Sequence, residues 1–115
     1  MKITVYEKPT WTTCRNLGQL FREQKIESER VNYFNEPFTI EKLTNLIKKT
    51  GMRPFELLRR GETVFKELNL SKETPDEEII NAMVEHPNLL QRPIVEVGDR
   101  AVLARPIEKA LEMIK

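Results

Sequence analysis

Apolar positions alternate with polar ones at the start of the chain and then change to a helical spacing. Ile3-Thr4-Val5-Tyr6 is rich in β-branched and aromatic residues, which favours a strand over residues 2–6. Apolar residues then recur at intervals of three and four, at Leu17, Leu20 and Phe21, and predict a helix over about residues 13–24. A second strand is expected over residues 28–33. This order favours a parallel strand pair with a right-handed connection.

The middle of the chain has only helical patterns. Thr39 is placed to cap a helix that Gly51 ends, and its apolar stripe consists of Ile40, Leu43, Leu46 and Ile47. Short helices are expected from Pro54 and around residues 64–68. Thr74-Pro75-Asp76-Glu77 reads as a capping box for a further helix, which His86-Pro87 ends. We therefore expect a helical insertion over about residues 38–90.

The last third returns to strands and closes with a helix. Residues 93–97 and 101–103 are apolar and β-branched, and Gly98-Asp99 between them is a turn. Pro106 is expected to start the terminal helix. The pattern as a whole predicts one α/β domain over residues 1–115, with a four-stranded mixed sheet, flanking helices and the inserted helical subdomain.

Composition and charge exclude several classes of function. Lys and Arg total 19 and Asp and Glu total 18, so the chain lacks the basic field that nucleic-acid binding needs. We expect no membrane segment, because no apolar stretch is long enough. A single cysteine and a single histidine leave a metal site short of ligands. One cysteine also makes an internal disulfide impossible, which favours a reducing, cytoplasmic setting.

The segment Trp11-Thr12-Thr13-Cys14-Arg15 is the candidate for chemistry. A strand, a loop with a cysteine and then a helix is the layout of a thiol-redox loop, because a helix N-terminus favours a thiolate. The nucleophile of such a loop usually comes first, where this chain has Trp11. On a helix, Cys14 would lie on roughly the same side as Trp11, about 4.5 Å further along the axis. Cys14 is thus either a displaced nucleophile, a thiol open to slow oxidation or a small core residue. Trp11 is either a hydrophobic plug or an anchor for a partner.

Four groups of residues resemble the glutaredoxin-dependent arsenate reductase family, which also contains the Spx regulators. In order, they are Ile3-Thr4-Val5-Tyr6 with Pro9 and Arg15, Leu57-Leu58-Arg59 before Phe65-Lys66-Glu67-Leu68, the run from His86 to Val95, and Leu103-Ala104-Arg105-Pro106. The resemblance covers essentially the whole chain and implies a thioredoxin-like fold.

The resemblance also implies a set of site residues. In family members that reduce arsenate, a cysteine at the position of Trp11 attacks the oxyanion, and arginines matching Arg59, Arg92 and Arg105 hold it. Arg15 matches the arginine just after the loop and is expected to help bind the oxyanion, and Pro93 matches the cis-proline of thioredoxin-like folds. Glutathione then acts as co-substrate and glutaredoxin as the recycling partner, with no bound cofactor.

Two departures from the family shape the expected function. Trp11 replaces the nucleophile and has no lone pair for the attack, and Glu7 stands where many relatives have histidine. We expect a family member whose reduction of arsenate to arsenite is weakened or lost. The alternatives are an Spx-like regulator that binds RNA polymerase and a non-catalytic oxyanion-binding or interaction domain.

Overall fold

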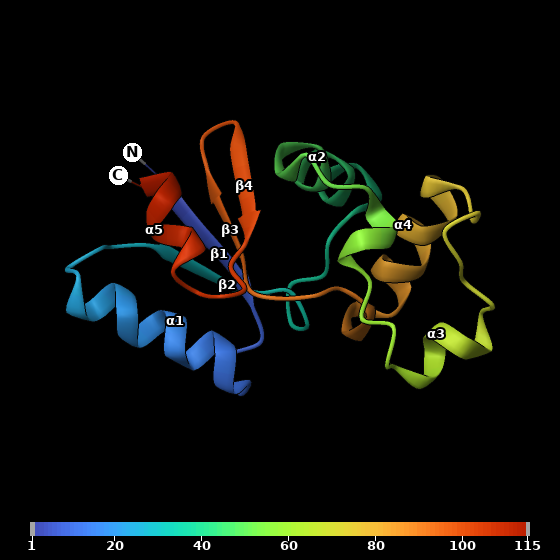
Figure 1. Cartoon of the computed structure of the whole chain (residues 1–115), viewed down its shortest axis with the longest axis horizontal. Coiled ribbons are helices and arrows are strands. Elements are labelled where there is room, and N and C mark those ends of the chain that lie inside the picture. Colours follow the sequence, from blue (N-terminus) through green and yellow to red (C-terminus); the bar gives the residue numbers. More distant parts are fainter. Residues whose placement is uncertain (1, 115) are drawn as a thin grey trace. The chain divides into compact units, whose positions relative to one another are not determined.

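The computed structural model describes residues 2–114, which form two compact units (Figure 1). One unit combines the chain up to Glu36 with the chain from Arg92 onward, and the other is Pro37–Gln91.

The first unit is built on a mixed sheet in the order β2-β1-β3-β4. Its elements are β1 (Ile3–Glu7), α1 (Thr12–Glu23), β2 (Glu29–Asn32), β3 (Ile94–Val97), β4 (Arg100–Leu103) and α5 (Lys109–Ile114). β1 pairs with β2 in parallel and with β3 antiparallel, and β3 pairs antiparallel with β4. This confirms the predicted mixed sheet with flanking helices.

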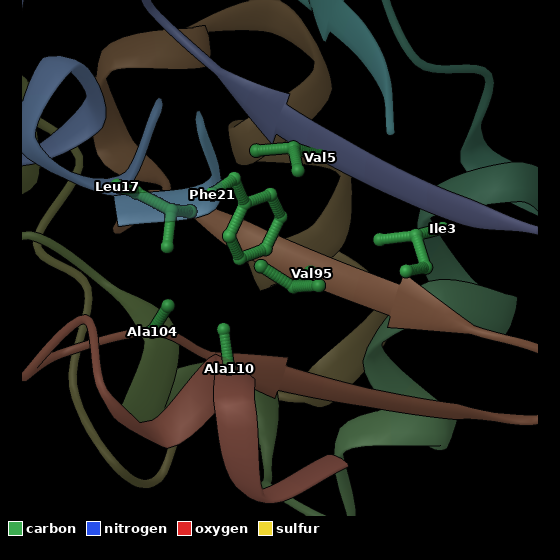
Figure 2. Packing of buried hydrophobic residues seen from close by; sticks show 7 residues of the cluster. All are labelled: Ile3, Val5, Leu17, Phe21, Val95, Ala104 and Ala110. Atoms are coloured by element: carbon green, nitrogen blue, oxygen red, sulfur yellow. The ribbon is translucent and has the colours of Figure 1, made fainter. Parts of the chain in front are cut away.

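The core of this unit lies between the sheet and its two helices (Figure 2). Val5 and Val95 are opposite each other on β1 and β3, so their side chains share one face of the sheet. Leu17 and Phe21 of α1 and Ala110 of α5 pack against that face. The apolar spacing along α1 therefore fixes which side of the helix is buried, and with it the position of the loop that precedes the helix.

The second unit is helical. Its elements are α2 (Ile40–Thr50), η1 (Pro54–Leu57), α3 (Thr63–Glu67), α4 (Asp76–Glu85) and η2 (Pro87–Leu89), where η marks a 3-10 helix. The Thr39 hydroxyl accepts a hydrogen bond of 3.1 Å from the Lys42 amide, as expected for the cap of α2. Gly51 ends α2 with a φ of 72°, a conformation that glycine adopts without strain.

Three local predictions were wrong. The last helix begins at Lys109 rather than at Pro106, because Pro106 lies in a bend and residues 107–108 form a turn before the helix. Thr74 forms no capping box; its hydroxyl accepts from the Ser71 amide, within the preceding turn. Ile40 is 52% exposed, so the buried stripe of α2 starts one turn later, at Leu43.

Candidate functional site

Trp11 occupies the boundary between loop and helix. It is the N-cap residue of α1, with φ −84° and ψ 140°, and its amide donates to the Lys8 carbonyl at 3.0 Å. The backbone at this position is extended, so the helical relation between Trp11 and Cys14 assumed from the sequence does not hold. Trp11 is half-buried, and the extended backbone of the loop, not the helix, sets the orientation of its side chain.

Arg92 lies beneath the indole of Trp11. Its side chain is almost fully buried, and its Nη1 donates a hydrogen bond of 2.9 Å to the Tyr33 hydroxyl. The guanidinium carbon lies 3.8 Å from the centroid of the Trp11 ring and 5.1 Å from that of Phe34. Arginine stacks well on aromatic faces because its charge is delocalised over a planar group. We call Trp11, Tyr33, Phe34 and Arg92 the aromatic–arginine cluster.

Cys14 is the third residue of α1 and is completely buried. Burial is the main reason that the pKa of its thiol lies above the ordinary value, and the Glu7 carboxylate raises this pKa further. A hydrogen bond with the Lys8 backbone and the charges of Arg92 and Arg30 lower the pKa, but the net shift is upward. The thiol is therefore protonated and shielded at neutral pH, which makes it a poor nucleophile.

The state of Cys14 gives a direct prediction of its reactivity. We expect the native thiol to react with a disulfide reagent at pH 8 at least about tenfold more slowly than in the denatured chain. The rate should rise further as the pH increases through the raised pKa, because the thiolate is the reacting form. A matched control is Cys14→Ser combined with Asn16→Cys, which moves the thiol to an exposed position on α1. Equal rates for the native protein and the control would contradict the burial of Cys14.

An ion pair beside Cys14 was missed in the sequence analysis. Glu7, at the end of β1, is buried and accepts from both Nε and Nη2 of Arg30 on β2, with 2.8 Å for the Nε bond. Arg30 Nη2 also donates to the Cys14 carbonyl at 3.3 Å. The parallel register pairs Glu7 with Asn32, so Arg30 is a diagonal neighbour of Glu7. The available signal was a pair of opposite charges, Glu7 directly after the first predicted strand and Arg30 within the second.

The remaining residues predicted for the site do not belong to the aromatic–arginine cluster, although Pro93 directly follows Arg92 in the chain. Arg15 is exposed on α1, and Arg105 is exposed just after β4. The bond between Arg92 and Pro93 is cis. Arg59 belongs to the second unit, where its guanidinium lies 3.8 Å from the Glu62 carboxylate. A joint role of the arginines in holding an oxyanion stays a prediction.

Residues 2–114 form neither a metal site nor a membrane-spanning helix. In this range, no group of three or more His, Cys, Asp or Glu side chains is placed to hold a metal ion. None of its helices is long and apolar enough to cross a membrane.

Comparisons with known proteins define the family. Residues 6–113 match the model of the ArsC family, and the chain belongs to this family. It is 36% identical over 115 residues to the uncharacterized protein YfgD of Escherichia coli, covering 98% of this chain and 97% of that protein. It is 36% identical over 113 residues to an arsenate reductase of Yersinia enterocolitica, covering 97% of this chain and 80% of the reductase.

A solved structure agrees with this assignment. An arsenate reductase from Vibrio cholerae superposes with a TM-score of 0.91 at 32% identity, and the match covers 97% of both chains. The α/β fold described above is thus the thioredoxin-like fold of the arsenate reductases.

Proposed function

We propose that this chain is an arsenate-reductase homologue whose reducing chemistry is weakened or lost while its scaffold is kept. The contact between Trp11 and Arg92 carries the proposal. The indole takes the place of the thiol that would attack arsenate, and it stacks on Arg92, for which the sequence resemblance implies a role in holding the oxyanion. An indole cannot form a covalent bond to arsenic in this way, because its nitrogen lone pair belongs to the aromatic system.

The state of Cys14 supports the same conclusion. Takeover of the attack would require an exposed thiolate close to the oxyanion, and a misplacement of about 1 Å can cost about a hundredfold in rate. Cys14 is instead buried, with a raised pKa. Slow glutathionylation of Cys14 is disfavoured for the same reason, because the sulfur must reach solvent to react.

The reductant forms the second part of the proposal. If a thiol is restored at position 11, we propose that glutathione and glutaredoxin supply the two electrons that convert arsenate to arsenite. A reducing cytoplasm provides both, and a chain with a single cysteine is suited to that compartment.

The decisive experiment compares this chain with its Trp11→Cys variant in an arsenate-dependent assay. Consumption of NADPH is followed with glutathione, glutathione reductase and glutaredoxin present. We expect background rates from the chain and measurable turnover from the variant, because the substitution supplies a nucleophile at the start of α1 and removes the indole from Arg92. Trp11→Ser is the matched control, since it removes the indole without adding a thiol.

Each other outcome contradicts a defined part of the proposal. Turnover by the unaltered chain that Cys14→Ser abolishes would show that Cys14 acts as the nucleophile. Silence from the Trp11→Cys variant, with folding verified by circular dichroism, would show that the oxyanion site was not retained.

A further inference from the structure

A small pocket beside α1 is lined entirely by residues of the first unit. Its volume is about 250 Å³, and its lining is Glu7, Pro9, Cys14, Arg15, Gly18, Arg22 and Arg30. Of its three arginines, Arg15 is one that the sequence resemblance implies for the oxyanion, whereas Arg22 and Arg30 are not. The pocket therefore requires an explanation of its own.

Arg30 is held in place at this pocket. Its guanidinium binds the buried Glu7 carboxylate through two nitrogens and the Cys14 carbonyl through one of them. It also lies against Gly18, where a Cβ atom would be only 3.3 Å from Arg30 Nη2. Glycine inside a helix lowers helix stability, and here its lack of a side chain leaves room for the guanidinium. Arg30 is thus a fixed part of the pocket rather than a mobile surface charge.

Arg15 and Arg22 complete the pocket from α1. Together with Gly18 they are spaced by three and four residues, so the three positions follow one face of the helix. Both arginines are exposed. The pocket lining contains three arginines and one glutamate, which leaves an excess of two positive charges around a concave surface. Guanidinium groups are well suited to bind phosphate and carboxylate oxygens through paired N–H donors.

We propose that this pocket binds a small oxyanion with two negative charges, of the phosphate type, between Arg15, Arg22 and Arg30. The Glu7 carboxylate holds Arg30 but does not compete for the anion, since Arg30 already neutralises it. The site shares Arg15 with the residues implied for arsenate, but it includes none of Trp11, Arg92 and Arg105.

The test is an NMR titration of the full-length chain, labelled with ¹⁵N, at pH 7.5 and constant ionic strength. Inorganic phosphate and acetate are the two probes. We expect phosphate to shift the amide signals of residues 14–22, and to bind at least about fivefold more tightly than acetate, since two excess positive charges favour the dianion. Constant ionic strength is essential because screening weakens contacts between exposed charges.

Three variants locate the binding. Arg22→Gln should weaken phosphate binding at least about fivefold, since it removes one guanidinium from the pocket. Arg100→Gln removes a charge from β4, outside the pocket, and should leave the affinity unchanged. Arg105→Gln, which affects the candidate arsenate site, should also leave it unchanged.

The proposal is overturned by any of three results. The first is no shift of the amide signals of residues 14–22 at 20 mM phosphate, a concentration on the order of the weakest affinity expected for such a contact. The second is an equal loss of phosphate affinity in Arg22→Gln and Arg100→Gln. The third is an equal affinity for phosphate and acetate. None of them bears on turnover by Trp11→Cys, so the failure of this proposal and the failure of the proposed function are distinguishable.

Discussion

Phe21→Ala is expected to lower the free energy of unfolding by about 3–5 kcal/mol. The ring of Phe21 is 2% exposed and packs in the core between α1 and the sheet, with Val5 and Val95 on the facing strands (Figure 2). Truncation to alanine removes most of this buried apolar surface and leaves a cavity that the surrounding strands can fill only in part. Urea unfolding followed by circular dichroism measures the loss.

The matched control lies on the same helix. Gln19 is exposed on α1, so Gln19→Ala should change the free energy of unfolding by less than about 0.5 kcal/mol. A loss below about 1 kcal/mol for Phe21→Ala would contradict the packing of α1 on the sheet.

Arg30→Ala is expected to cost about 2–3 kcal/mol of unfolding free energy. The substitution leaves the Glu7 carboxylate buried without its bidentate partner, and an uncompensated buried charge is expensive. The estimate lies below the about 3–5 kcal/mol of a fully buried pair, because the Arg30 side chain is 30% exposed and water screens part of the interaction. Urea unfolding at pH 7 measures the change.

A double-mutant cycle separates this pair from general effects of losing a side chain. Glu7→Gln combined with Arg30→Ala should cost less than the sum of the two single changes, because the second change no longer breaks an ion pair. Arg22→Ala removes an exposed arginine from α1 and should change stability by less than about 0.5 kcal/mol. Additive effects of Glu7→Gln and Arg30→Ala would show that the two side chains do not interact.

Much of the fold follows from the spacing of apolar residues. The intervals at Leu17 and Phe21 predicted α1 and its buried face, and Thr39 and Gly51 marked the ends of α2 to within a residue. These signals are local, since they depend on side chains within one or two turns of each other. Pro106 shows the limit of such local signals. Proline suits the first turn of a helix but does not by itself start one, and here the helix begins at Lys109.

The site was harder to predict because its contacts join distant parts of the chain. The fold brings Trp11 and Arg92 together from distant parts of the chain, and no pattern in the sequence around either residue predicts this contact. Glu7 and Arg30 meet only because two strands pair in a particular register. The resemblance named Trp11, Cys14 and the arginines, but it left their surroundings unknown. Dependence on glutaredoxin and the polymerase-binding alternative stay predictions.

The stacking of Trp11 on Arg92 also gives the protein a built-in optical reporter. Trp11 is the one tryptophan in the sequence, so the indole emission of the whole chain comes from a single known place. Its ring lies 3.8 Å from a guanidinium, at the boundary between the loop and α1. Any event that moves Arg92 away from the ring changes the surroundings of the only indole. The state of the aromatic–arginine cluster can therefore be followed by emission in dilute solution, without attaching a label.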